Sequence, residues 1–141
     1  MKNEELLDNL LQVTDALATD MAAYLRRYGL TTSKVHLLWT LHRSGSCKQR
    51  DLAAVLEHSP RHVTTLVDEL TAAGYVTRRP HQDDRRAVLV ELTPTATELL
   101  DQMAAGRVEL AGQLFGHLDS PTRDGLGVQL AELGKRLAAL V

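Results

Sequence analysis

The stretch from residue 59 to residue 93 constrains the fold most, because its apolar residues change from helical to strand spacing. Ser59 and Pro60 form a helix-start signal, since serine can accept a hydrogen bond from a free N–H and proline needs no donor at the first helical position. Apolar residues then recur with the spacing of one buried helical face, at Val63, Leu66, Val67 and Leu70. Gly74 is suited to end this helix, because glycine adopts the left-handed conformation without steric cost.

Beyond Gly74 the apolar spacing changes to two, which predicts strands. The two runs are residues 76–80 and 88–92, with a polar, turn-prone segment, residues 81–86, between them. We therefore expect a two-stranded ribbon with a charged tip after a helix that has a polar outer face. Such a unit suits duplex DNA, because a helix fits the major groove and arginines at a ribbon tip can reach the backbone or the minor groove.

Two segments of this stretch resemble the winged helix-turn-helix of the MarR family of transcriptional regulators. Residues 84–93, DRRAVLVELT, match the family's wing pattern of D-x-R, five residues and L-T, and residues 59–70, SPRHVTTLVDEL, are similar to its recognition helix. The resemblance implies a mainly α fold with a small β-hairpin wing: a winged helix-turn-helix plus a helical dimerisation region. It also implies that Arg86 reaches into the minor groove and that Asp84 holds it by a charge-assisted bond.

The expected DNA-binding face combines the short helix before the recognition helix, the polar face of the recognition helix and the wing. Its candidate residues are Lys48, Arg50, Ser59, Pro60, Arg61, His62, Thr64, Thr65, Arg78, Arg79, Asp84, Arg85 and Arg86. Arg61 and Thr65 are expected to reach base edges. Arg78 and Arg79 lie on a strand, where their flexible heads are expected to meet phosphate.

The length and composition suit one domain with a real core, since the chain has 141 residues and 44% of them are apolar. Residues 1–141 are predicted to form a single MarR-like domain, with residues 31–93 as the DNA-binding lobe and residues 1–30 and 94–141 as the dimerisation region. The sequence has no run of eighteen apolar residues and no signal peptide, so no membrane partner is expected. A single cysteine fits a reducing cytoplasm.

The net charge of −2 argues mildly against nucleic-acid binding, for which a basic domain is usual. The charge is sorted along the chain, however. Residues 43–93 hold eight lysines and arginines against seven aspartates and glutamates, a net charge of +1, and the remainder carries −3. The alternative function is a winged-helix module that binds another protein and not DNA.

Five further helices are expected, from about residue 4 to Gly29, and over about 32–42, 48–56, 94–118 and 120–140. Thr93 and Ser120 are each followed by proline and are expected to cap the last two. Lys48 stands where MarR-like chains usually have a threonine or serine cap. The helix at residues 48–56 is therefore expected either to fray or to be capped by Ser46.

Leucines at both ends of the chain predict a partner. In the last helix they follow the alternating spacing of four and three that is typical of a helix–helix seam, and exposed apolar patches generally mark interfaces. In the MarR family the first and last helices of two subunits interleave, which implies a homodimer. The expected interface residues are Leu6, Leu10, Leu130, Leu133 and Leu137. The alternative is that the last helix folds back on the first within one chain.

The histidines and the cysteine do not predict a metal or cofactor site. His36 and His42 do not share a helical face, and a turn between His58 and His62 is expected to disrupt their four-residue spacing. Cys47 is expected to fill the edge of the wing sheet. The alternative, a redox switch, is disfavoured because peroxide-sensing relatives carry the reactive cysteine in the first helix, where this chain has none.

Aromatic and basic side chains gather near the junction of the first two helices, and the resemblance implies a pocket there for a small aromatic anion. The candidate residues are Tyr24, Tyr28, Trp39, His42 and Arg43. The alternative places Trp39 and His42 in the ordinary core. The chain has no hydrolase elbow, phosphate loop or evident carboxylate pair, so we expect no enzyme. The predicted function is a sequence-specific regulator of transcription that binds pseudo-palindromic double-stranded DNA, a repressor released by a small molecule.

Overall fold

The computed structural model describes residues 1–141, which form two compact units, Met1–Leu100 and Asp101–Val141. The first unit holds α1 (Asn3–Arg26), α2 (Thr32–Ser44), β1 (Cys47–Lys48), α3 (Gln49–Leu56), α4 (Pro60–Ala72), β2 (Val76–Pro80), β3 (Val88–Leu92) and the start of α5 (Pro94–Phe115). The second unit holds the rest of α5 and α6 (Ser120–Leu140). The predicted fold class, mainly α with a small β wing, is confirmed.

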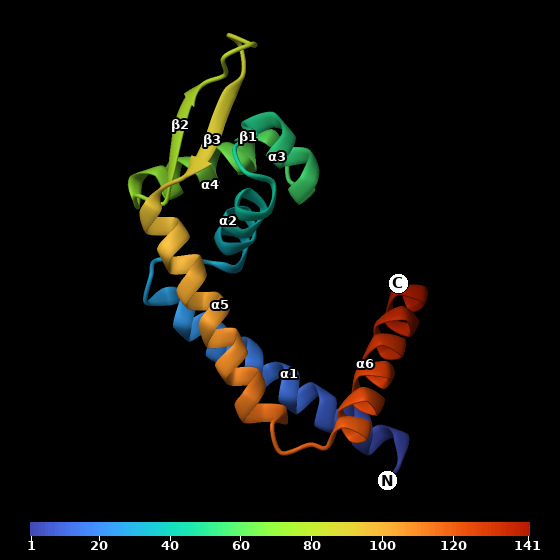
Figure 1. The fold of residues 1–141 in the computed structure, drawn as a ribbon. Helices are drawn as coiled ribbons and strands as arrows, with labels where there is room; N and C mark the ends of the chain where they lie inside the picture. Colours follow the sequence, from blue (N-terminus) through green and yellow to red (C-terminus); the bar gives the residue numbers. More distant parts are fainter. The chain divides into compact units, whose positions relative to one another are not determined.

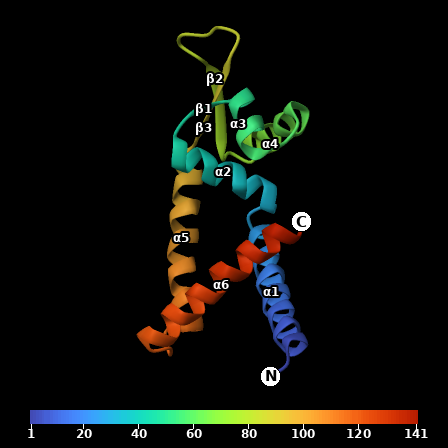
Figure 2. The same ribbon diagram turned by 90° about the vertical axis from the view of Figure 1, so that its right-hand side faces the viewer.

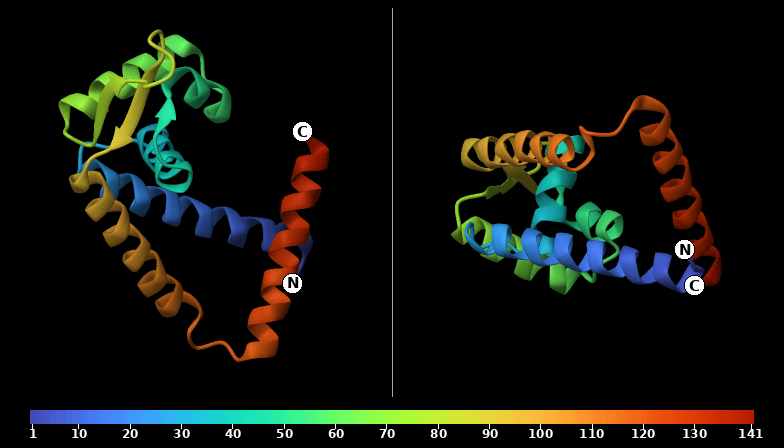
Figure 3. Two further views of the ribbon diagram at one scale, coloured as in Figure 1. Left: turned by 45° about the horizontal axis from the view of Figure 1, so that its top comes forward. Right: turned by 90° about the horizontal axis from the view of Figure 1, so that it is seen from below.

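Glycines in the left-handed region follow three of the helices. Gly29, Gly45 and Gly74 have φ angles of 68°, 75° and 84°, and they follow α1, α2 and α4. The predicted role of Gly74 is confirmed. The first helix ends earlier than expected, at Arg26, and a turn fills the distance to Gly29. Figure 3 shows α1 as one continuous helix that leads into α2.

The start of α3 has no side-chain cap. Of the two expected alternatives, a cap by Ser46 is not formed, because the Ser46 hydroxyl donates to Glu91 Oε1 on β3 at 2.7 Å. The cap of α5 is as expected, since Thr93 Oγ1 accepts from the Ala96 N–H at 3.2 Å.

The junction between α5 and α6 differs from the prediction in two details. The cap of α6 is Asp119 and not Ser120, because Asp119 Oδ1 accepts the Thr122 N–H at 2.8 Å. Helix α5 ends at Phe115, three residues before the expected end at Leu118. The serine and the aspartate are adjacent and both are good caps, so the sequence alone did not separate them.

The sheet has three antiparallel strands in the order β1-β3-β2. The predicted ribbon of β2 and β3 is present, and β1 is a third strand that the sequence did not predict. Cys47 and Lys48 pair with Val90 and Leu89, which confirms the expected place of Cys47 at the edge of the wing sheet. A two-residue strand is too short to show an alternating pattern in the sequence. Figures 1 and 2 show the hairpin of β2 and β3 extending beyond α2, α3 and α4, with its tip away from these helices.

The core lies wholly in the first unit, because every buried side chain falls between Leu25 and Leu100. The apolar stripe of α4 is at most 5% exposed, and burying one such side chain is worth about 1.5–3 kcal/mol. Two polar contacts add to this packing: Lys34 Nζ on α2 lies 2.9 Å from Glu69 Oε2 on α4, and the Tyr75 hydroxyl donates to the Tyr28 carbonyl at 3.0 Å. The buried stripe holds α4 so that its opposite face points outward.

Candidate nucleic-acid interface

The first turn of α4 is set by the predicted helix-start signal. The Ser59 hydroxyl accepts the His62 N–H at 3.1 Å, and Pro60 occupies the first helical position. Because the apolar stripe is buried, the outer face of α4 is exposed, and it carries Arg61, Thr64 and Thr65 as predicted. This face is polar, convex and of the width of one helix, which is the shape that enters a major groove.

The strand arginines do not have the free heads that the sequence suggested. Arg78 Nη2 lies 2.6 Å from Asp68 Oδ1 on α4. Arg79 Nη2 forms an ion pair with Glu91 on the neighbouring strand. The prediction of flexible heads is wrong, because Arg78 lies beside a carboxylate of α4 and Arg79 lies beside a carboxylate of β3.

The wing tip is ordered by side chains that bind backbone N–H groups. Asp84 Oδ1 accepts the Arg86 N–H at 3.1 Å, and His81 Nδ1 accepts the N–H groups of Asp83 and Asp84 at 3.1 and 3.2 Å. His81 belongs to the polar, turn-prone segment of residues 81–86 that the sequence predicts between the two strands. Arg85 and Arg86 are both exposed at this tip.

The implied bond between Asp84 and the Arg86 guanidinium is not formed. Asp84 Oδ2 instead faces Arg50 Nη2 on α3 at 3.4 Å, while Oδ1 is used on the Arg86 backbone. Because only two positions across a tight turn separate Asp84 from Arg86, the carboxylate reaches the Arg86 backbone N–H more readily than the guanidinium at the end of the long side chain. Asp84 therefore connects the wing tip to α3 and leaves the Arg86 guanidinium without a partner in the chain.

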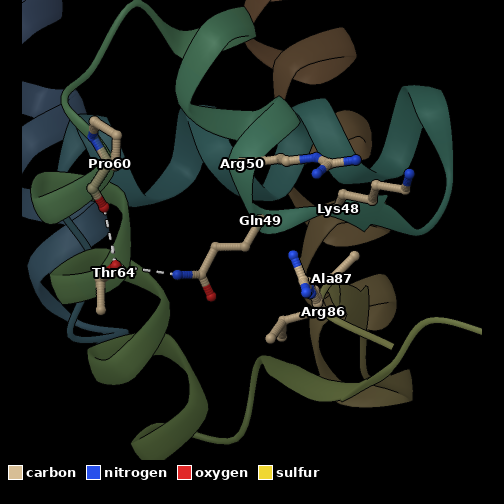
Figure 4. A pocket seen from close by; sticks show the side chains of 8 residues that line it. Lys48, Gln49, Arg50, Pro60, Thr64, Arg86 and Ala87 are labelled. Atoms are coloured by element: carbon tan, nitrogen blue, oxygen red, sulfur yellow. Dashed lines mark hydrogen bonds between the residues drawn. The ribbon is translucent and has the colours of Figure 1, made fainter. Parts of the chain in front are cut away.

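A hollow of about 200 Å³ lies between α3, the start of α4 and the wing. Its lining includes three cations, two polar residues and three apolar residues: Lys48, Arg50 and Arg86; Gln49 and Thr64; and Pro60, Ala87 and Val88. Figure 4 shows Lys48, Arg50 and Arg86 around this hollow, with Gln49 reaching toward Thr64. Gln49 is not among the residues predicted for this face, because the two partners of its side-chain amide lie 15 and 29 residues away in the sequence.

The two histidines at the turn before α4 are in contact. The ring centroids of His58 and His62 lie 4.6 Å apart in an edge-to-face arrangement. The expectation that the turn would separate them is wrong, because the turn brings His58 back beside the first turn of α4. The structure has no group of three or more histidine, cysteine, aspartate or glutamate side chains that could hold a metal ion.

Four of the five candidate effector residues form two aromatic pairs, and the fifth, Arg43, is exposed. The rings of Tyr24 and Tyr28 lie 5.3 Å apart, and those of Trp39 and His42 lie 5.4 Å apart. Burial and a hydrogen bond with Tyr28 raise the pKa of the Tyr24 hydroxyl above its ordinary value. Trp39 is half-buried and His42 is exposed, so neither is an ordinary core residue.

Burial also raises the pKa of the Cys47 thiol, and the nearby carboxylate of Asp51 adds to the effect. A raised pKa reduces the thiolate fraction at neutral pH, and the thiolate is the reactive form. This thiol is therefore poorly suited to sensing oxidants.

The terminal leucines are uncovered in the single chain. In α6 no side chain is buried, and Leu130, Leu133 and Leu137 are 47%, 41% and 59% exposed. In α1, Leu6 is exposed and Leu10 is half-buried. No helix is long and apolar enough to span a membrane.

Comparison with known proteins identifies relatives of this chain. Residues 30–88 match the model of the MarR family. The HTH-type regulator YhbI of Bacillus subtilis is 27% identical over 117 residues, 83% of this chain and 76% of that protein. The repressor YetL of the same organism is 25% identical over 136 residues, 95% of this chain and 81% of its own length.

Solved structures share the fold. The FabT protein of Streptococcus pneumoniae, solved in complex with DNA, superposes with a TM-score of 0.81 at 16% identity, over 99% of this chain and 100% of that chain. The matched residues 30–88 include α2, α3, α4 and the first strand of the wing, which are the elements described above. The resemblance to the MarR family is thus confirmed over residues 30–88, which match the model of that family.

Proposed function

We propose that this chain is a sequence-specific regulator of transcription that binds double-stranded DNA through α4 and the wing. The observation that carries the proposal is the basic hollow beside the exposed face of α4. Lys48, Arg50 and Arg86 line it and supply three cations for backbone phosphate, while Arg61 and Thr65 are exposed on the adjoining helix α4. Phosphate contacts would set the position of the protein, and the helix face would read base edges.

Binding to random duplex DNA at stepwise salt tests this proposal. A protein that neutralises phosphates releases counterions, so the logarithm of its affinity falls linearly with the logarithm of salt concentration, by about 0.9 per phosphate contact. We expect a slope of several units for the wild type. An affinity that does not change with salt, or no affinity at low salt, would contradict the proposal.

The DNA-bound form is proposed to be a homodimer built from residues 1–30 and 94–141, with residues 31–93 as the DNA-binding lobe. The support is the second unit, Asp101–Val141, which buries none of its side chains although α6 carries a regular leucine seam. Exposed apolar patches of this kind generally mark protein interfaces. Sedimentation tests the assembly, and a folded monomer at micromolar concentration would contradict it.

Repression, relief by a small aromatic anion, and a cytoplasmic setting are finer parts of the same proposal. YetL, a relative, is named a repressor. The Tyr24–Tyr28 and Trp39–His42 pairs, together with Arg43, supply aromatic faces and a cation of the kind that bind an aromatic carboxylate. The single free thiol suits a reducing compartment.

A second candidate function is a winged-helix module that binds a protein. It is favoured by the net charge of −2 and by the pairing of Arg78 and Arg79 with carboxylates, which removes two cations from the face offered to DNA. The salt titration separates the two functions, because a protein-binding module would have no steep salt-dependent affinity for duplex DNA.

A further inference from the structure

The side-chain amide of Gln49 joins three elements of the DNA-binding lobe. Its Nε2 donates to the Thr64 hydroxyl on α4 at 3.0 Å, and its Oε1 accepts from Arg78 Nε on β2 at 3.1 Å. Gln49 itself begins α3. Figure 4 shows its side chain extending from α3 to Thr64.

This contact fixes the direction in which the Thr64 hydroxyl can bond. A hydroxyl has one hydrogen to donate and two lone pairs to accept with. The Thr64 hydroxyl donates its hydrogen to the Pro60 carbonyl at 2.9 Å, and Gln49 occupies one lone pair. Toward the exterior Thr64 can therefore only accept.

We propose that Gln49 is a specificity-determining residue, which holds Thr64 as an acceptor so that the start of α4 selects a base with an exocyclic amino group. In the major groove such groups are adenine N6 and cytosine N4, whereas guanine and thymine present O6 and O4 acceptors. Guanine O6 or thymine O4 would face the Thr64 oxygen as a second acceptor. Both groups would then be buried without a hydrogen bond, which costs binding free energy. The inference deepens the proposed function and rests on it.

The Arg78 guanidinium is held by the same network. It bonds to Gln49, to the Thr64 carbonyl at 3.4 Å and to Asp68 at 2.6 Å. A change at Gln49 could therefore act through Arg78 instead of Thr64, and the test must separate the two routes. Gln49→Glu does so, because a carboxylate still accepts from Arg78 but has no N–H for Thr64.

The test selects binding sites from a randomised duplex library with four variants and the wild type. The wild type should prefer adenine or cytosine at one position of each half-site, by roughly three- to tenfold, as expected for one hydrogen bond. Gln49→Met, Gln49→Glu and Thr64→Val should each lose this preference at that position and retain the rest of the site. Thr32→Val, at an exposed threonine that begins α2 and lies outside the candidate DNA-binding and dimer residues, is the matched control for Thr64→Val and should behave as the wild type. Thermal melting of each variant verifies that it is folded.

Duplexes with a base analogue then test the amino group itself. At the selected position, purine replaces adenine or 2-pyrimidinone replaces cytosine, and each lacks the amino group. The wild type should lose the same three- to tenfold in affinity, while Gln49→Glu should be insensitive. A wild type that binds selectively while Gln49→Glu and Gln49→Met keep its preference, or one whose affinity does not change when the amino group is removed, overturns this inference alone. A wild type that binds no duplex overturns the proposed function as well.

Discussion

Asp84 at the wing tip pairs with Arg50 on α3, with 3.4 Å between Oδ2 and Nη2. The other oxygen of the same carboxylate accepts the Arg86 N–H at 3.1 Å. One side chain thus shapes the backbone beneath Arg86 and connects the wing to the helix-turn-helix. The Arg86 guanidinium stays available for an external partner, and the narrow minor groove of A·T-rich DNA attracts such a cation.

This relationship predicts different effects of two substitutions of Asp84 on the preference for A·T-rich flanks. Asp84→Asn keeps an oxygen for the Arg86 N–H, so it should retain the preference for A·T-rich flanks. Asp84→Ala loses that oxygen and should lose part of the preference, although both changes remove the same negative charge. Affinities for sites with A·T-rich and G·C-rich flanks, with Arg86→Ala as the reference for full loss, measure the effect. If Asp84→Ala binds more tightly than the wild type on both flanks, Asp84 is only a repulsive charge.

The ion pairs of the strand predict unequal roles for the cations of the lobe. Arg78 is bound to Asp68, whereas Lys48 has no ion pair in the chain. Lys48→Gln should therefore reduce the salt slope of DNA binding by about one unit, and Arg78→Gln should reduce it by much less. Equal reductions would mean that Arg78 leaves Asp68 to contact phosphate, which is possible because exposed ion pairs contribute only about 0–1 kcal/mol.

Most of the fold was predictable, because its signals are local. The serine and proline before α4, the four-residue apolar stripe and Gly74 each act within a turn or two of their own position. The site was less predictable, because its contacts join distant segments: Ser46 with Glu91, Gln49 with Arg78, and Asp84 with Arg50. Periodicity shows which face of an element is buried, but it does not show which polar side chains meet between elements.

Backbone strain at the turn before α4 gives a prediction about stability. Glu57 directly follows α3 as its C-cap, and with φ at 55° it is the only residue other than glycine with a positive φ. A residue with a side chain in this region loses about 1–2 kcal/mol of stability relative to glycine. A glycine variant does not gain all of this, because glycine also increases the conformational entropy of the unfolded chain. Glu57→Gly should be more stable than Glu57→Ala by about 0.5–1 kcal/mol in denaturant unfolding. The alanine variant removes the same charge, so equal stability of the two would show that the turn is not strained.

The thiol of Cys47 is predicted to react slowly at neutral pH. Because burial raises its pKa, the thiolate should form only at a pH above the ordinary range for cysteine, and the curve of alkylation rate against pH should shift to higher pH. Iodoacetamide labelling of the folded protein, compared with the protein in denaturant, measures this shift. Labelling at pH 7 that is as fast in the folded protein as in denaturant would contradict the protected position at the sheet edge.

Selection of binding sites by the wild type and by a variant with Leu133→Asp and Leu137→Asp tests the central claim most directly. A dimer that reads DNA with two copies of α4 should enrich a pseudo-palindromic site whose half-site centres lie about 10–10.5 base pairs apart. The double substitution places two charges in the exposed seam of α6, so it should abolish that paired site. Enrichment of a single asymmetric element by the wild type, the same paired site with the variant, or no enrichment at all would contradict the account.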